Sequence, residues 1–420
     1  MKLKKLVGLL MVAGIAAPGV ASATNGYFSH GYGIKAKGMA GVGIALPQDA
    51  LAAATNPAGM VMLGNRLDVG LDWFRPNRET QLDSNFGPFA GTYSGNDTKN
   101  FFIPEIGYNR MVNPNMSWGI SVYGNGGMNS DYKDLNSRTI GLSPVPGNGL
   151  LGNGKAGVDL SQLFIAPTFA MKLNPDHAIG VSLNLAYQRF KAEGLQNFDN
   201  PMSTSSMGNV TNNGYDSSTG WGVRLGWTGK VAPNVTLGAT YQSKTRMGKF
   251  SKYKGLFAEQ GDFDIPANYG VGIAVKVNPQ TTIAADVEKI QYSGVRAIAN
   301  SGSNMAQLGT DGGPGFGWRD MTIFKLGVSH ELSNALTLRA GYSKGRQPIP
   351  SDQTFFNILA PAVVEDHFTL GATWALANNA ELSLGYMHAF KKGVTGTGAT
   401  AGISPRMYQN SFGVAYGWKM

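Results

Sequence analysis

Strict alternation between large apolar and small or polar side chains is the feature of this sequence that most limits its fold. The clearest run is 179–188, where one side carries Ile179, Val181, Leu183, Leu185 and Tyr187 and the other carries Gly180, Ser182, Asn184, Ala186 and Gln188. The pattern recurs at 221–228, 368–376 and 411–418. Strands of an outer-membrane barrel alternate in this way because one face meets lipid and the other meets the lumen. A soluble β-sandwich also alternates, but its polar face normally carries more Lys, Glu and Thr than these Gly-rich faces.

Turn signals indicate the number of strands. Clusters of Pro, Asn, Asp, Ser or Gln, which favour tight turns, stand at 113–115, 174–176, 232–234, 278–280, 332–334 and 378–379. Longer connections rich in Gly, Ser, Asn and Pro lie near 76–99, 127–158, 191–218, 247–267, 294–318, 346–366 and 392–406. Because outer-membrane barrels join strands by short periplasmic turns and longer external loops, the sequence predicts an all-β, 14-stranded antiparallel transmembrane β-barrel with both termini in the periplasm. The expected strands lie near 66–75, 100–112, 116–126, 160–173, 178–190, 219–231, 235–246, 268–277, 281–293, 319–331, 335–345, 367–377, 380–391 and 407–419.

The N-terminus has the features of an export signal. Three lysines within the first five residues precede an apolar run at 6–17, and Ala21-Ser22-Ala23 has the small residues of a cleavage site. The apolar run is about half of the roughly 20 residues that a membrane-spanning helix needs. We therefore expect a signal peptide at 1–23, an N-terminal plug at 24–64 and a barrel at 65–420.

Composition excludes several classes of function. The chain has no Cys, which rules out disulfides and thiol chemistry. Its formal charge of +9 is scattered rather than clustered, so a nucleic-acid partner has little support. The five His residues show no metal-ligand spacing and no G-x-S-x-G motif is present. We expect no catalytic residue, metal or cofactor, although a barrel enzyme acting on lipids through dispersed residues stays an alternative.

The stretch 25–60 is rich in Gly and Ala and lacks strand alternation, as expected of a compact segment inside a barrel. It contains Gly26-Tyr27-Phe28, His30-Gly31, Lys37-Gly38-Met39-Ala40-Gly41, Asp49-Ala50 and Asn56-Pro57-Ala58. These motifs resemble the N-terminal hatch, with its short helices, of the FadL/OmpP1/TodX family of outer-membrane transporters for long-chain fatty acids and hydrophobic compounds. The resemblance implies a Gram-negative outer-membrane protein.

Apolar side chains in an external loop are unusual unless they face a ligand or another loop. The segment 247–267 carries five, Phe250, Leu256, Phe257, Phe263 and Ile265. They are candidates for a hydrophobic docking groove, or they only pack the loop on the barrel rim. The segment also resembles the family's fourth external loop, which with the third forms a surface groove for substrate. The third loop, near 191–218, contains Leu195, Phe198, Met202, Met207 and Val210.

A carboxylate that enters a low-dielectric lumen needs a positive or hydrogen-bonding partner. Strand parity predicts lumen-facing charges at Arg224, Lys276, Arg319, Lys325 and Arg339, with Asp286 and Glu288. Structural ion pairs are the alternative role for any of these charges. Arg319 is the preferred carboxylate partner because residues 315–320 resemble a family motif near the binding region.

Gating is assigned to two segments. Glycines at Gly124, Gly126 and Gly127 predict a weak or bulged strand, and the family has an inward kink in this strand that opens a side window. We expect Asn56, Pro57 and Ala58 to latch against Gly124 and Gly126, and ligand to displace Tyr27 and Phe28. The alternative is that Asn56-Pro57-Ala58 only terminates a helix.

These features predict a monomer that mediates ligand-gated passive diffusion of long-chain fatty acids or similar hydrophobic molecules. Substrate is captured at the outer loops, passed to a lumen site and released sideways into outer-membrane lipid. A channel for aromatic hydrocarbons is the nearest alternative. A general porin is disfavoured because a plug and apolar loops would obstruct polar solutes.

Overall fold

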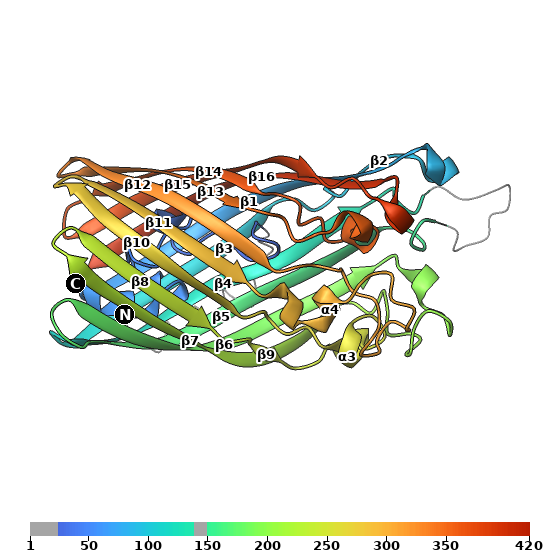
Figure 1. Ribbon diagram of the computed structural model, residues 1–420, viewed down its shortest axis with the longest axis horizontal. Helices are drawn as coiled ribbons and strands as arrows, with labels where there is room; N and C mark the ends of the chain where they lie inside the picture. The colour runs from blue at the N-terminus through green and yellow to red at the C-terminus, as the bar shows by residue number, and fades with distance from the viewer. Residues whose placement is uncertain (1–23, 138–148) are drawn as a thin grey trace.

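The computed structural model describes residues 24–137 and 149–420, which contain a closed barrel of 14 antiparallel strands (Figure 1). The wall strands are β1 (Arg66–Leu82), β3 (Phe101–Asn113), β4 (Met116–Tyr132), β5 (Ala156–Lys172), β6 (His177–Glu193), β7 (Asp216–Ala232), β8 (Val235–Gln242), β10 (Asn268–Asn278), β11 (Thr281–Ile290), β12 (Met321–Ser333), β13 (Leu336–Gly345), β14 (Asp366–Ala375), β15 (Ala380–Gly393) and β16 (Ile403–Lys419). Two short strands lie beside this wall, β2 (Gly91–Ser94) on β1 and β9 (Arg246–Met247) on β7. The barrel closes where β16 pairs with β1 from Arg66↔Lys419 to Leu82↔Ile403. The predicted fold class is confirmed.

The alternation in the sequence becomes the two faces of the wall. In β6 the apolar set of Ile179, Val181 and Leu183 is exposed on the outside, whereas Ser182, Asn184 and Gln188 are buried inside. Exposed apolar side chains around a barrel form its lipid-facing surface. None of the helices within the described residues is long and apolar enough to cross a membrane.

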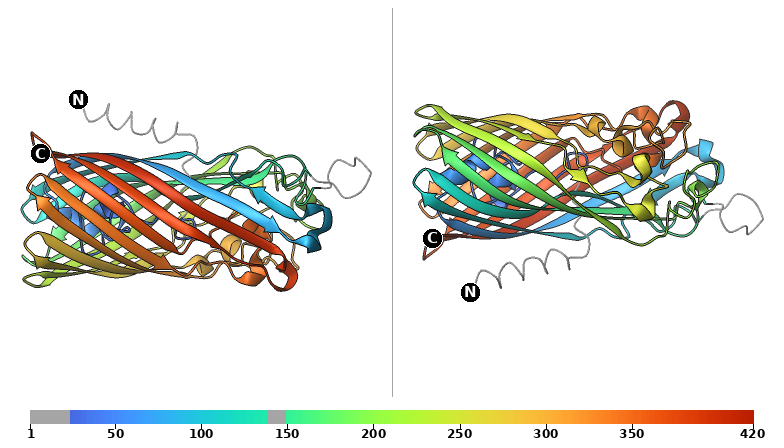
Figure 2. Two further views of the ribbon diagram at one scale, coloured as in Figure 1. Left: turned by 90° about the horizontal axis from the view of Figure 1, so that it is seen from above. Right: turned by 90° about the horizontal axis from the view of Figure 1, so that it is seen from below.

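The six predicted turns lie together at one end of the barrel, and the long connections lie at the other end (Figure 2). The strands extend further into the long connections than predicted, since β1 continues to Leu82 and β4 to Tyr132. Short helices form in these connections: η3 (Ser84–Phe89), η4 (Gln196–Phe198), η5 (Ser251–Tyr253), α3 (Ala258–Gly261), η6 (Tyr292–Gly294), α4 (Arg296–Ala299), η7 (Ser351–Gln353), η8 (Phe356–Ile358) and η9 (Gly398–Thr400).

Residues 24–64, here called the lumenal segment, lie inside the barrel and are mostly buried (Figure 1). The segment contains α2 (Ile34–Lys37), η1 (Ala52–Ala54) and η2 (Pro57–Met62). Inward-facing glycines leave room for its backbone: a side chain at Gly107, Gly238 or Gly341 would collide with it. The predicted signal peptide at 1–23 lies outside the described residues.

One stretch of the wall lacks strand pairing. The register between β3 and β4 ends at Ile106↔Val122, although β3 begins at Phe101 and β4 runs to Tyr132. On its other side β4 stays paired with β5 up to Tyr132↔Ala156, with a bulge between Gly124 and Gly126. We call the region between 101–105 and 123–130 the β3–β4 gap.

Candidate functional site

The outer loops enclose an apolar cavity with about 510 Å³ of empty space. Its walls come from β5, β6 and four connections, and include Val158, Phe190, Leu195, Phe198, Leu256, Phe257, Leu308, Phe316 and Leu359. Phe257 is held in place by Phe190, whose ring centroid lies 4.7 Å from its own. Leu256 and Phe316 are only partly buried. We call this space the outer-loop cavity, and its lining suits an alkyl chain or an aromatic ring.

A cluster of aromatic rings connects the outer-loop cavity to the lumenal segment. Phe263 packs on Phe257 with ring centroids 4.8 Å apart, and on Tyr27 with centroids 6.1 Å apart. Tyr27 also contacts Tyr292 and Trp318, at 5.5 Å and 6.1 Å. The Tyr27 ring is fully buried among them. The first residues of the lumenal segment therefore separate the outer loops from the lumen.

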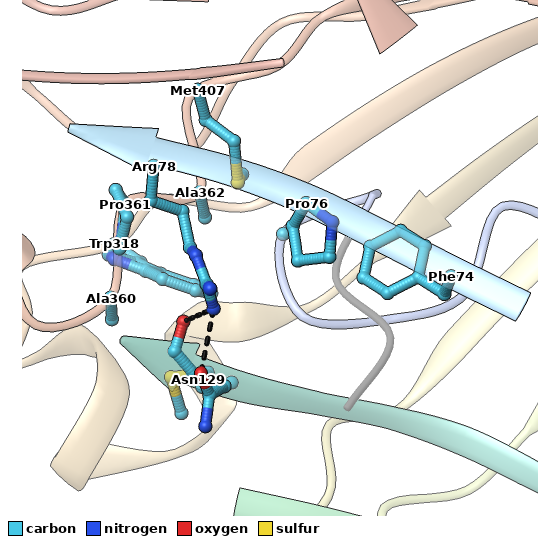
Figure 3. A pocket seen from close by; sticks show the side chains of 11 residues that line it. Phe74, Pro76, Arg78, Asn129, Trp318, Ala360, Pro361, Ala362 and Met407 are labelled. Carbon is cyan, nitrogen blue, oxygen red and sulfur yellow. Dashed lines mark hydrogen bonds between the residues drawn. The ribbon is translucent and has the colours of Figure 1, made fainter. Parts of the chain in front are cut away.

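A second cavity lies beside these rings, is bordered by Gly26 and Trp318, and contains about 350 Å³ of empty space (Figure 3). Its lining is almost entirely apolar: Gly26, Phe74, Pro76, Met128, Trp318, Ala360, Pro361, Ala362 and Met407, with Arg78 and Asn129 as the polar groups. We call it the arginine cavity. Arg78 extends from β1 toward Asn129 on β4, beside the Trp318 ring (Figure 3).

Arg78 is 1 % exposed. Its Nη1 donates to the backbone oxygen of Asn129 at 2.6 Å and to Oδ1 at 2.7 Å, and its Nη2 donates to the backbone oxygen of Thr98. All of these acceptors are neutral, and within the described part of the chain no carboxylate forms an ion pair with Arg78. A buried charge without a counter-charge is costly. The arginine cavity therefore offers a buried cation whose hydrogen-bond acceptors are all neutral, although the carboxylates of Asp131 and Asp159 act on it from a longer distance.

The lumenal segment is bound directly to the bulge in β4. The amide of Gly127 donates to the backbone oxygen of Tyr27 at 2.9 Å, and the amide of Ser29 donates to the backbone oxygen of Asn125 at 3.1 Å. Phe28 and Gly126 form an antiparallel bridge. A side chain at Gly126 would collide with the Tyr27 carbonyl. Residues 27–29 thus act as a short interior strand next to the β3–β4 gap.

Ionic contacts fix the rest of the lumenal segment. Lys37 Nζ lies 2.8 Å from Asp72 Oδ2 and 3.5 Å from Glu105 Oε2. Lys35 and Arg66 share the carboxylate of Glu381. Such buried pairs are strongly destabilised when one partner is removed.

Two other titratable groups of the segment have shifted pKa values. Burial, followed by the charge of His367, lowers the pKa of His30 to about 3. Burial, followed by the charge of Asp68, raises the pKa of Asp49 to about 7. Both groups are therefore neutral or partly neutral near pH 7 in the folded protein.

The sequence matches the family of outer membrane protein transport proteins (OMPP1/FadL/TodX) over residues 15–418. The chain belongs to this family. It is 22 % identical over 371 residues to the long-chain fatty acid transport proteins of Escherichia coli and Shigella flexneri, an alignment that covers 76 % of each chain.

Solved structures of the OMPP1/FadL/TodX family share the fold. The toluene transporter TodX of P. putida has a TM-score of 0.71 at 20 % identity, covering 93 % of this chain and 99 % of its own. A Pseudomonas aeruginosa FadL homologue has a TM-score of 0.68 at 14 % identity, with coverage of 94 % and 99 %. This member of the family is therefore an outer-membrane protein for transport of hydrophobic molecules, as predicted.

The structure separates the predicted loop residues of this family member into two groups. Leu256 and Phe257 line the outer-loop cavity, together with Leu195 and Phe198 from the third loop. Phe250, Phe263 and Ile265 are fully buried in the hydrophobic core. They are not among the residues that line the outer-loop cavity, so their expected place in the groove walls is wrong. Substrate contact at Leu256 and Phe257 stays a prediction.

The prediction that Arg319 faces the lumen is wrong. β12 begins at Met321, so Arg319 lies in the preceding connection, where it is exposed and lines a polar surface groove with Arg346 and Asp352. The inward alternation of β12 predicts an inward side chain at position 319 only if the strand starts there, and it starts two residues later. The neighbouring Trp318, which is 2 % exposed, is the residue that points inward.

The other predicted lumen charges mostly have structural partners. Lys325 pairs with Glu288 at 2.8 Å, and Arg339 donates to Gln48 and Thr373. Arg224 bonds to Thr55, Thr240, Gln242 and Asn268. Lys276 is exposed near a turn rather than buried in the lumen. Arg78 is not identified from the sequence, because a loop is expected from residue 76 onward. In the structure β1 continues to Leu82, and Phe74, Pro76, Arg78 and Thr80 all face inward.

The predicted latch of Asn56 on strand β4 is also wrong. Asn56 Nδ2 donates to the backbone oxygens of Ile44 at 2.7 Å and of Trp227 in β7 at 2.9 Å. Pro57 and Ala58 lie against Gly180 in β6. Asn56 also caps η2 by accepting from the Ala58 amide at 3.1 Å, so it begins a helix rather than ending one. The irregularity at Gly124 and Gly126 does exist, but residues 27–29 occupy it.

Proposed function

We propose that this protein mediates ligand-gated passive diffusion of long-chain fatty acids or similar amphiphilic carboxylates across the outer membrane. The observation that carries the proposal is Arg78, a buried cation with neutral partners in an otherwise apolar cavity. Apolar space beside a buried positive charge that forms no ion pair matches an alkyl chain that ends in a carboxylate. In this proposal the mature chain begins at Thr24, works as a monomer and needs no metal or cofactor.

Capture begins in the outer-loop cavity. Complete burial of a large apolar side chain is worth about 1.5–3 kcal/mol, and an alkyl chain gains in the same way from leaving water. The partly buried Leu256 and Phe316 provide surface that a ligand can cover. The ligand then moves toward Tyr27 along the aromatic rings of Phe257 and Phe263.

The arginine cavity is the second site. The hydrogen bonds from the Arg78 guanidinium to amide oxygens are already charge-assisted. A carboxylate adds the attraction between two opposite charges, which is strong in apolar surroundings, so it competes well with these amide oxygens. Release then follows the β3–β4 gap sideways into the membrane. This route is favoured over a vertical one because buried ion pairs at Lys35 and Lys37 hold the lumenal segment across the barrel. The lumenal segment acts as the hatch.

The test compares an acid with its ester. Replacing Arg78→Gln should weaken oleate binding about tenfold or more, because a hydrogen bond to a charged group is worth about 1.5–3 kcal/mol, and should change methyl oleate binding little. Arg339→Gln is the matched control, since it removes a half-buried arginine that faces the lumen away from the arginine cavity. Equal losses for oleate and methyl oleate would overturn the carboxylate assignment.

Uptake of monoaromatic hydrocarbons is the second candidate function. The outer-loop cavity carries no charged side chain, and its rings suit a small aromatic molecule. Toluene transporters are among the proteins with this fold, although a similarity of 20 % identity supports the fold alone. In this case toluene would bind wild type and Arg78→Gln equally, and oleate would show no preference for the arginine.

A further inference from the structure

The β3–β4 gap has a defined frame. Its lower limit is the Ile106↔Val122 pair, the last in the β3–β4 register. Its upper limit is a parallel bridge between Asn96 and Asp131, where the amide of Asp131 donates to the backbone oxygen of Gly95 at 3.1 Å. Between these limits the two wall strands are not joined by a ladder.

Two groups fill the gap from the inside. Residues 27–29 pair with β4 at the bulge in its lower part. The Arg78 side chain fills its upper part, where it bonds to Asn129 of β4 (Figure 3). It also bonds to the backbone oxygen of Thr98, which precedes β3, so it contacts both rims. The Phe101 ring, at the first residue of β3, lies 5.9 Å from the guanidinium carbon. Arg78 therefore connects the two edges of the wall where backbone pairing is missing.

Cavities lie on both sides of this contact. The arginine cavity lies inside and includes Arg78 and Asn129. A cavity with about 850 Å³ of empty space lies on the other side, and its lining includes Thr98, Phe101, Phe102 and Asn129. Charged side chains also line it: Asp131 of β4, Asp159 of β5, and Lys191 and Glu193 of β6. Both cavities share Asn129. Separation of the guanidinium from Asn129 and Thr98 would join them into one passage.

We infer that Arg78 is a clasp that holds the β3–β4 gap closed, and that the charge of the ligand opens it. The inference rests on the proposed function, because the carboxylate that binds Arg78 is also what draws the guanidinium away from Asn129 and Thr98. The guanidinium binds a carboxylate more strongly than an amide oxygen, because the attraction between two opposite charges adds to the hydrogen bond. A neutral analogue of the same length occupies the apolar part of the arginine cavity and leaves the clasp closed.

The absence of Cys from the chain allows specific spin labelling. One label replaces Phe102, which points outward from β3 and is 51 % exposed, and the other replaces Tyr187 on the outer face of β6, which is joined to β4 through β5. Oleate should shift the measured distance to longer values, and saturating methyl oleate should not. Labels at Val271 and Phe324 are the control pair, because the continuous ladders of β10, β11 and β12 join them. An equal shift with acid and ester would overturn the clasp.

Arg78→Met tests the clasp without ligand. The longer Phe102 to Tyr187 distance should appear in this variant before any oleate is added, whereas Arg339→Met should keep the wild-type distance. A wild-type distance in Arg78→Met would overturn the clasp. Failure of the proposed function is seen separately, as unchanged oleate affinity in Arg78→Gln.

Discussion

The backbone oxygen of Tyr27 accepts a hydrogen bond from the amide of Gly127 at 2.9 Å, so the lumenal segment provides β4 with a pairing partner where β3 does not. The same residue places its ring among Phe263, Tyr292 and Trp318, below the outer-loop cavity. Movement of Tyr27 therefore changes both the aromatic partition and the β4 edge. Position 126 allows this contact to be tested.

Gly126→Ala should loosen residues 27–29 rather than seal the wall, because the added methyl group collides with the Tyr27 carbonyl. We expect faster hydrogen exchange at the Ser29 amide, which donates to Asn125, while the barrel stays folded. Gly294→Ala is the matched control because nothing lies within 4 Å of the added methyl group. Unchanged exchange at Ser29 would contradict the pairing.

Asn56→Ala should loosen a different part of the lumenal segment. The change leaves the carbonyls of Ile44 and Trp227 without this donor, at a cost of about 1–3 kcal/mol. Hydrogen exchange should rise in η2 and around Ile44, with no change at the Gly127 amide. Asn304→Ala, in an exposed loop, is the control. Faster hydrogen exchange at the Gly127 amide would show that Asn56 is coupled to β4, although its side-chain amide donates to Ile44 and Trp227 instead.

The strand count could be predicted from sequence because alternation and turn signals are local properties. Contacts of the lumenal segment could not, since inward-facing glycines occur on β3, β4, β6, β7, β8 and other strands and do not indicate which strand faces Asn56. Arg78 and Arg319 show the same limit for the candidate site. Both residues lie near the end of a strand, where sequence patterns are least informative. The sequence predicts that β12 starts at 319, which would turn Arg319 into the lumen, but the strand starts at Met321 and Arg319 lies on the surface.

Leu256→Ser combined with Phe316→Ser should weaken oleate capture about tenfold, because both side chains line the outer-loop cavity and are only partly buried. A loss of 1.4 kcal/mol corresponds to a factor of ten, which is within the range for apolar surface of this size. Binding can be measured by fluorescence competition on the folded barrel. Met305→Ser, at a position 99 % exposed in the same group of loops, should have no effect. Wild-type affinity in the double variant would contradict a role of the outer-loop cavity in substrate capture.

Acid should weaken the docking of the lumenal segment through His30. Its folded pKa of about 3 lies below the ordinary value of about 6.5. The undocked segment therefore binds more protons between these values. Stability from this group is complete above pH 6.5 and decreases as the pH falls, by about 2 kcal/mol at pH 5.

His30→Gln isolates this effect, because Asp49, with a raised pKa of about 7, acts in the opposite direction in both proteins. The groups around His30 are His367, Lys37 and Asp72, and all remain in the variant. Protease sensitivity of the segment should increase from pH 7.5 to pH 5 more in wild type than in His30→Gln. The same pH response in both proteins would show that another group controls docking.

The unequal distribution of charge along the lumenal segment determines how it can move. Lys35 and Lys37, in the middle of the segment, form ion pairs with carboxylates of the wall. Residues 25–29 are held by backbone hydrogen bonds and ring contacts instead. Ring contacts can be exchanged for similar contacts with an apolar ligand, but a buried ion pair has no such substitute in the lumen. Residues 25–29 can therefore move while the ion pairs of Lys35 and Lys37 stay formed. Only these few residues have to return to their original contacts after each transport cycle.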